Sequence, residues 1–134
     1  MSEVLLFEQH GSAAILTLNR TEKRNALSAD LLRSIDEAVD FVDTEPSVRG
    51  VILTGGQKMF SSGADLKEAL AATSMVETAR FLENFRRTND RLESLSKPVV
   101  AAINGYCLTG GLELALCCDF RISGAGAKFG VTSA

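Results

Sequence analysis

The sequence has little of what disulfide, metal or triad chemistry requires. Its 134 residues include three cysteines, one histidine and no tryptophan. Three cysteines, with Cys117 and Cys118 adjacent, form neither a disulfide framework nor a CxxC metal site, so we expect them to be small core residues. The single histidine, His10, precedes Gly11 in a predicted turn. A zinc site or a His-dependent triad would depend on this one side chain, which we expect to be exposed.

Concentrated charge and long apolar runs are also missing. The net charge is −3 and acids and bases are intermixed along the chain, which disfavours nucleic acid and membrane surfaces as partners. No apolar run reaches the length of a membrane span, and the first residues lack the layout of a signal peptide. We therefore expect a cytoplasmic protein. With 46% hydrophobic residues, residues 1–134 can bury the core of one domain.

Hydrophobic periodicity predicts an α/β fold in which strands alternate with helices. The predicted strands are residues 5–9, 13–18, 51–54, 99–103, 120–123 and 127–131, with a hairpin at each end of the chain. Ser28 is the predicted N-cap of a helix that ends near Asp43, and longer and shorter helices are predicted at 75–96 and 112–118. The face of 75–96 predicted to be buried comprises Val76, Phe81, Leu82, Phe85, Leu92 and Leu95.

Two glycine-containing helix starts are candidate anion sites. After the strand 99–103, a turn leads into a helix that begins at Gly110 and Gly111, whose backbone N–H groups are open to a ligand. Gly63 and Ala64 precede a second, short helix that Asp65 is predicted to cap.

Glu113 lies in the first turn of the helix after Gly110. Its neighbours are apolar, which predicts a buried helix on which a carboxylate needs a partner or a chemical role. The alternative is an ordinary helix glutamate in solvent. Lys23, Arg24 and Lys67 are exposed basic residues that can meet an anionic ligand. Ser61 and Ser62 have only His10 as a possible base for a nucleophilic role.

Four segments, in order along the chain, resemble the crotonase (enoyl-CoA hydratase/isomerase) family: residues 18–27, 60–67, 104–115 and 118–122. The resemblance implies a spiral of ββα units that assembles as a homotrimer or hexamer and binds acyl-CoA thioesters. Coenzyme A would then be part of the substrate, and no metal or redox cofactor is called for. Because family members are considerably longer, residues 1–134 resemble a crotonase-like core domain with the C-terminal portion missing.

The resemblance also implies roles for individual residues. The backbone N–H groups of Ala64 and Gly110 would form an oxyanion hole, and Glu113 would deprotonate the water that attacks a 2-enoyl-CoA. The segments that would contact the substrate comprise Arg24, Asn25, Ala26, Leu27, Ser62, Gly63, Ala64, Asp65, Leu66, Lys67 and Gly110.

Two positions depart from the family pattern. The second catalytic glutamate of the family corresponds to a position at or near Ser133, where there is no acid, and Thr109 replaces a glycine. Besides hydration, the sequence leaves open double-bond isomerisation, which the missing acid disfavours, and non-catalytic binding of acyl-CoA, which incomplete acid–base machinery would favour. A serine peptidase on the similar spiral fold is a third alternative.

Overall fold

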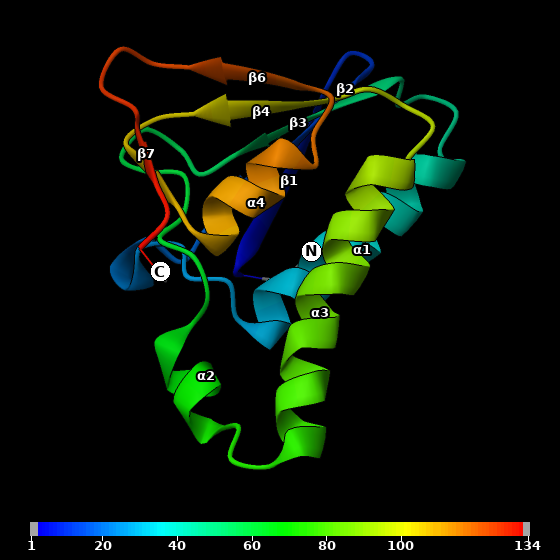
Figure 1. The fold of residues 1–134 in the computed structure, drawn as a ribbon. Coiled ribbons are helices and arrows are strands. Elements are labelled where there is room, and N and C mark those ends of the chain that lie inside the picture. The colour runs from blue at the N-terminus through cyan, green and yellow to red at the C-terminus, as the bar shows by residue number, and fades with distance from the viewer. Residues whose placement is uncertain (1–2, 133–134) are drawn as a thin grey trace.

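The computed structural model describes residues 3–132 as a mixed α/β fold in which the helices lie on one side of a sheet (Figure 1). The strands are β1 Leu5–His10, β2 Ala13–Leu18, β3 Gly50–Thr54, β4 Val99–Ile103, β5 Tyr106–Leu108, β6 Phe120–Ser123 and β7 Lys128–Gly130. The helices are α1 Ala29–Thr44, α2 Leu66–Ala71, α3 Met75–Ser94 and α4 Gly110–Leu116, with a 3₁₀ helix at Thr21–Lys23. None of the helices in the described part of the chain is both long and apolar enough to cross a membrane.

The main sheet has the strand order β1-β2-β3-β4-β6. The predicted first hairpin is confirmed, because β1 and β2 pair antiparallel through the turn at Gly11, which has a φ of +59°. The other three neighbouring pairs, β2 with β3, β3 with β4 and β4 with β6, are parallel. Helical crossovers connect these parallel strands, as parallel pairing requires.

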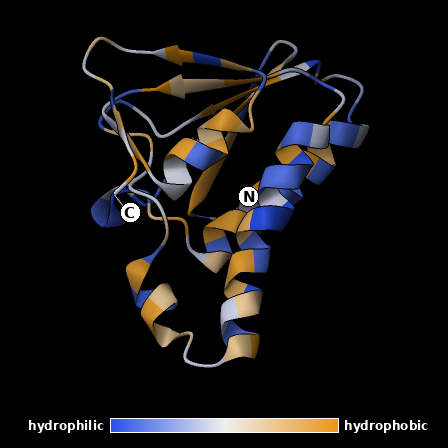
Figure 2. Cartoon of the chain, in the orientation of Figure 1, coloured by the Kyte–Doolittle hydropathy of each residue, from blue (hydrophilic) through white to orange (hydrophobic). Residues whose placement is uncertain are grey.

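The core lies between the sheet and the helices. Buried and partly exposed residues alternate along β2, β3 and β4, and the register places Leu16, Leu53 and Ala101 side by side on the buried face. Helix α1 covers this face with an apolar stripe at helical spacing. Its start is as predicted, because the Ser28 hydroxyl accepts a hydrogen bond from the Leu31 amide at 3.1 Å. Figure 2 shows the resulting alternation of hydrophobic and hydrophilic sides on the helices.

The predicted hairpin at the C-terminal end is wrong. Strand β6 joins the edge of the main sheet, whereas β7 pairs in parallel with β5 in a separate two-stranded sheet. Strand β5 was missed because its three residues, Tyr106–Leu108, lie between a turn signal and a glycine-containing helix start.

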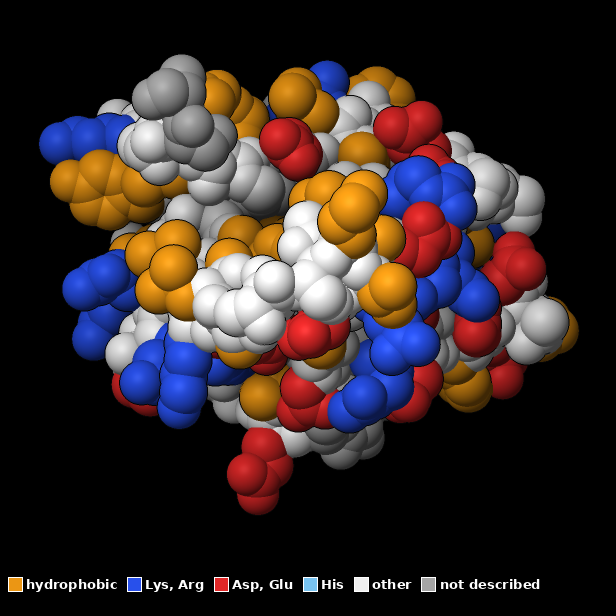
Figure 3. All heavy atoms as spheres, turned by 60° about the horizontal axis from the view of Figure 1, so that its bottom comes forward, with side chains coloured by type: hydrophobic (Ala, Val, Ile, Leu, Met, Phe, Trp, Pro, Cys, Tyr) orange, Lys and Arg blue, Asp and Glu red, His pale blue; other side chains and the backbone are white. Residues whose placement is uncertain are grey.

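The predicted burial of helix α3 is only partly correct. Val76 is 61% exposed and Leu82 is 59% exposed, whereas Leu92 is buried as expected. The physical reason is visible in Figure 1: the first half of α3 extends with α2 beyond the sheet, and only its second half packs against α1. Figure 3, which brings this end forward, shows hydrophobic side chains among charged ones.

A buried polar contact joins α1 to α3. Asp36 accepts hydrogen bonds from the Thr88 hydroxyl at 2.7 Å and from Arg87 Nε at 2.8 Å. Thr88 is fully buried and Asp36 is nearly so. The pair therefore fixes which part of α3 lies against α1.

We expect Thr88→Val to lower the free energy of unfolding by about 1–3 kcal/mol, because it leaves a buried carboxylate oxygen without its donor. Urea unfolding followed by circular dichroism measures this. The control is Thr44→Val, an exposed helix position at which the change should stay within about 0.5 kcal/mol. Equal effects of the two substitutions would contradict the importance assigned to the Thr88–Asp36 contact.

Candidate functional site

The site begins with Asn25, which is completely buried. Arg24 and Asn25 both adopt left-handed backbone conformations, with φ values of 55° and 53°, and asparagine tolerates this conformation better than most residues. The Asn25 side chain accepts a hydrogen bond from the Arg20 amide at 2.8 Å and donates to the carbonyls of Gly55 at 3.2 Å and Phe60 at 3.1 Å. It thus fastens the loop after β2 to the loop after β3.

Ser61 extends this connection toward Ala64. Its hydroxyl donates to the Asn25 carbonyl at 2.8 Å and accepts from the Gly63 amide at 3.1 Å. The Leu27 amide donates to the Gly63 carbonyl at 2.8 Å. Within residues 3–132, the Ala64 N–H itself donates no hydrogen bond.

The start of helix α4 lies directly against this segment. A Cβ on Gly63, whose φ is +108°, would collide with the Thr109 hydroxyl, and a Cβ on Gly111 would lie 2.7 Å from the Ser61 carbonyl oxygen. Glycine is therefore required at both positions for the two segments to approach each other.

The two predicted oxyanion residues are brought together by this approach. An ideal Cβ on Gly110 would lie 3.5 Å from the Ala64 nitrogen, in ordinary van der Waals contact. Gly110 is the first residue of α4, so its N–H has no partner inside the helix, and it has none elsewhere in the described chain. Two backbone donors without partners in the described chain thus lie close together. Their role as an oxyanion hole stays a prediction.

Glu113 lies three residues after Gly110 and therefore on the same side of α4. The prediction that this helix is buried nearly all round is wrong: Gly111, Leu114 and Ala115 are buried, but Glu113 and Leu116 are exposed. Helix α4 turns only one side to the core. The Glu113 side chain has no hydrogen bond or ion pair with any residue from 3 to 132, so its carboxylate is available to a ligand.

The cysteines are not nucleophiles at this site. Cys107 and Cys118 are buried, and Cys117 is partly so. Burial, together with the nearby carboxylates of Glu93, Asp90 and Glu113, raises the pKa of the Cys117 thiol to about 12. Their predicted role as core residues agrees with this placement.

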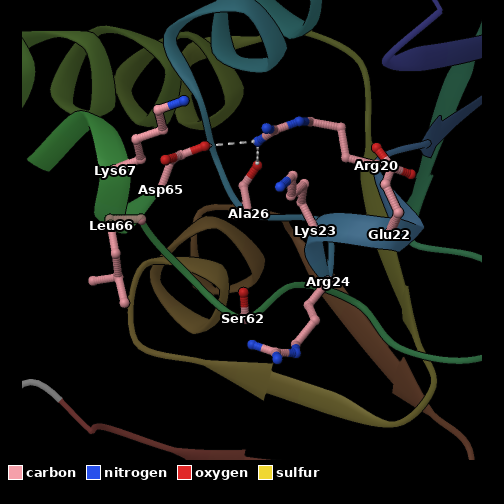
Figure 4. A pocket seen from close by; sticks show the side chains of 10 residues that line it. Arg20, Glu22, Lys23, Arg24, Ala26, Ser62, Asp65, Leu66 and Lys67 are labelled. Carbon is pink, nitrogen blue, oxygen red and sulfur yellow. Dashed lines mark hydrogen bonds and ion pairs between the residues drawn. The ribbon is translucent and has the colours of Figure 1, made fainter.

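A pocket of about 480 Å³ opens beside Ala64 (Figure 4). Seven of the predicted contact residues line it: Arg24, Ala26, Ser62, Ala64, Asp65, Leu66 and Lys67. Lys23, which the sequence analysis had named only as a possible contact of an anionic ligand, lines it too, and so do Arg20 and Glu22, which were not predicted to line it. Asn25, Leu27 and Gly63 are buried behind this surface, and Gly110 lies next to Ala64 outside the pocket lining.

The pocket is rich in positive charge. Lys23 ends the 3₁₀ helix after β2 and Arg24 follows it, whereas Lys67 comes from α2 on the other side (Figure 4). In the part of the chain that the structure describes, none of these three side chains pairs with an acid. Their charges are available to an anionic ligand such as a phosphate.

Arg20, by contrast, is engaged within the protein. Its Nη1 lies 3.2 Å from Asp65 Oδ2 and 2.6 Å from the Ala26 carbonyl oxygen. Asp65 caps α2 as predicted, by accepting the Glu68 amide at 3.2 Å. The Glu68 carboxylate accepts the Ala29 amide at 2.8 Å, so α2 is tied to the start of α1 as well. These contacts hold the residues that flank Ala64.

An aromatic pair borders the two amides on another side. Phe85 Cε1 would lie 3.6 Å from a Cβ on Gly110. The ring of Phe81 packs against Phe85 in a T-shaped arrangement with centroids 5.3 Å apart. The amides therefore lie between a charged pocket and an apolar wall.

The remaining candidates are not assembled into a site. The Ser61 hydroxyl is buried and fully engaged, and His10 is exposed beside Glu8 at 3.5 Å. Ser133 lies outside the described residues. Among residues 3–132 there is no group of three or more His, Cys, Asp or Glu side chains that could hold a metal ion.

Comparisons with known proteins show the family of the chain. The sequence model of the family described as enoyl-CoA hydratase/isomerase matches residues 8–134. The chain is 39% identical over 127 residues to a short-chain-enoyl-CoA hydratase of Clostridium acetobutylicum, covering 94% of this chain and 48% of that protein. It is 41% identical over 129 residues to a crotonyl-CoA hydratase of Syntrophomonas wolfei, covering 96% and 49%.

Solved structures agree with the fold. A crystal structure of an enoyl-CoA hydratase/carnithine racemase from Magnetospirillum magneticum superposes with a TM-score of 0.93 at 37% identity, covering 98% of this chain and 50% of that chain. The crotonase-like fold expected from the sequence is thus confirmed. The chain spans about half the length of the curated relatives it matches.

The Asp65 contacts predict a pH dependence of stability. Burial raises the pKa of Asp65, but hydrogen bonds from the Glu68 amide and Arg20, with the Arg20 charge, outweigh burial and leave the pKa below its ordinary value of 3.8. Because the pKa of Asp65 is lower in the folded than in the unfolded protein, the ionised carboxylate stabilises the fold at a pH above the unfolded-state pKa. This stabilisation is lost as the pH falls through the folded-state pKa.

We therefore expect wild type to unfold at higher urea concentration than Asp65→Asn at neutral pH. The difference should shrink as the pH falls below 3.8, because protonated Asp65 and Asn are both neutral. Urea midpoints measured at pH 7, 5, 4 and 3 test this. A difference that stays constant with pH would contradict the assigned ion pair.

Proposed function

Because the chain belongs to the enoyl-CoA hydratase/isomerase family, we propose that it adds water across the double bond of a 2-enoyl-CoA thioester. The observation that carries the proposal is the proximity of Ala64 and Gly110, whose N–H groups have no partner within residues 3–132. A thioester carbonyl oxygen placed between them would accept two hydrogen bonds. These bonds strengthen as negative charge develops on the oxygen, which makes Cβ electrophilic and stabilises the enolate.

Glu113 is the proposed general base. It lies one helical turn from Gly110 and carries a carboxylate without a partner in the described chain. It would take one proton from water while the hydroxyl oxygen bonds to Cβ and the π electrons move into the enolate. Protonated Glu113 would then return that proton to Cα, so the net change is the addition of H and OH.

The charged pocket is the proposed site of the coenzyme A moiety. The phosphates of coenzyme A carry negative charge. Lys23, Arg24 and Lys67 line the pocket, and none of them pairs with an acid within residues 3–132. Phe85 borders the amides, so it is the proposed apolar wall for the acyl part. The substrate would thus lie with its polar and apolar ends on either side of Ala64.

Assembly and location remain predictions. The homotrimer or hexamer expected from the family would have to be tested by the mass of the protein in solution. The cytoplasmic location expected from the sequence would have to be tested by fractionation of the cells that produce the protein.

Two alternatives concern the same site. Isomerisation moves a proton between two carbons and would use Glu113 without a water molecule. Non-catalytic binding of acyl-CoA has a specific observation in its favour, since Glu113 is exposed and no second side chain in the described chain orients it. Hydration, isomerisation and simple binding differ in their products, so they can be separated directly.

The amide pair is tested by Gly110→Ala. The added methyl would lie 3.5 Å from the Ala64 nitrogen and 3.6 Å from Phe85 Cε1, so it would fit without colliding with the protein but would crowd the proposed position of the carbonyl. We expect turnover of crotonyl-CoA to fall by about 10²–10³-fold. Stability should change by less than about 1 kcal/mol.

The matched control is Gly126→Ala, at a glycine whose added Cβ meets nothing within 4 Å. Loss of enoyl absorbance measures turnover, and thermal unfolding measures stability. A Gly110→Ala variant with wild-type turnover would exclude this pair of amides as the carbonyl site.

The base is tested by Glu113→Gln. We expect hydration to slow by about 10²–10⁴-fold, because the amide cannot accept the proton of water. Affinity for butyryl-CoA, measured by calorimetry, should stay within about threefold, because the carbonyl and phosphate contacts do not involve this carboxylate. Binding without turnover in both wild type and variant would favour the non-catalytic alternative instead.

A further inference from the structure

Thr109 has an unfavourable backbone conformation and does not cap helix α4 with its side chain. Its φ is 47° and its ψ is −115°, a positive-φ conformation that is unfavourable for a β-branched residue. It is the N-cap of α4, yet its side chain makes no capping hydrogen bond to the helix. Threonine at an N-cap normally contributes through that bond. Its presence here needs another explanation.

The hydroxyl of Thr109 is used across the gap between the two amide-bearing segments. It donates to the Ser62 carbonyl oxygen at 3.3 Å. Ser62 lies two residues before Ala64, and Thr109 directly precedes Gly110. The bond therefore joins the two segments of the chain that lead to the Ala64 and Gly110 N–H groups.

The same hydroxyl also limits how closely the segment with Gly63 approaches the segment with Gly110. It lies so near Gly63 that a Cβ there would collide with it, and a Cβ built on Gly63 would be 3.3 Å from the Gly110 nitrogen. Gly63 supplies the carbonyl carbon of the peptide whose N–H belongs to Ala64. Thr109 is thus in contact with the peptide groups on both sides of the gap.

The backbone of Thr109 connects this contact to two further elements. Its N–H donates to the Gly130 carbonyl in β7 at 2.9 Å, and its carbonyl accepts the Glu113 amide at 3.0 Å. One residue therefore joins the Ser62 loop, the first turn of α4 and the second sheet. A change at Thr109 would shift the amides relative to each other and relative to Glu113.

We propose that Thr109 is a positioning residue whose hydroxyl sets the separation of the Ala64 and Gly110 N–H groups, and thereby the polarisation of a bound thioester carbonyl. This rests on the proposed function. Removing the hydroxyl leaves both N–H groups present but relaxes their spacing. The expected consequence is weaker polarisation of the carbonyl, whereas the phosphate contacts to Lys23, Arg24 and Lys67 do not involve the hydroxyl and should be unchanged.

The test uses the carbonyl itself as the probe. Butyryl-CoA labelled with ¹³C at the thioester carbonyl has no double bond to hydrate, and two hydrogen bonds move its carbonyl resonance downfield on binding. We compare wild type with Thr109→Ser, which keeps the hydroxyl, and Thr109→Val, which replaces it by a methyl of similar shape. Thr109→Gly removes the hydroxyl while accepting the left-handed backbone, and so provides a variant without backbone strain.

We expect Thr109→Ser to keep the wild-type downfield shift, and both Thr109→Val and Thr109→Gly to lose at least half of it. Affinity for coenzyme A alone should be equal in all four proteins. A wild-type shift in Thr109→Gly or a folded Thr109→Val would overturn the role of the hydroxyl while leaving the proposed function intact. Binding of butyryl-CoA to wild type without any downfield shift would overturn the amide pair, and with it the proposed function.

Discussion

The arrangement of the site depends on one buried carboxamide. Asn25 is fully buried, and its side chain bonds the Arg20 amide and the carbonyls of Gly55 and Phe60, while its own carbonyl accepts the Ser61 hydroxyl. Each of these groups would cost about 1–3 kcal/mol if it were buried without a partner. An Asn side chain carries both donors and an acceptor and also tolerates the left-handed backbone required here. Few other side chains meet all of these conditions at once.

From this constraint follows the placement of the two amides. Strands β3 and β4 are parallel neighbours, with Thr54 paired to Ala102, so the loops that follow them leave the same edge of the sheet. Ligands of α/β proteins bind outside this carboxyl edge. Asn25 and Ser61 hold the first loop, and the absence of Cβ atoms at Gly63 and Gly111 lets the second approach it. The proposed donors are therefore backbone N–H groups, and side chains such as Asn25 and Ser61 act by holding the segments that carry them.

Local signals in the sequence were sufficient for much of this picture. Ser28 and Asp65 cap their helices as predicted, and the strands through β4 lie within about one residue of their predicted ends. Features decided by distant packing were not predicted. Strand β5 is only three residues long, and its partner β7 lies twenty residues further along the chain, beyond the reach of periodicity. The exposure of Val76 and Glu113 depends on how far the sheet extends beneath α3 and α4, which no local pattern records.

The two parts of the proposed mechanism differ in how firmly the protein holds them. The carbonyl donors are backbone groups, whereas the general base is one side chain. A preorganised donor in an oxyanion hole contributes about 10²–10³-fold to rate, and a positioned general base about 10²–10⁴-fold. The first contribution requires that Ala64 and Gly110 stay close, and the buried Asn25, the close packing at Gly63 and the Thr109 hydroxyl all act on that spacing. The second requires that the exposed Glu113 carboxylate be held against a water molecule, and no side chain within residues 3–132 holds it. Polarisation of a thioester should therefore be the more robust property of this chain. Hydration depends on whatever orients Glu113 once the substrate is bound.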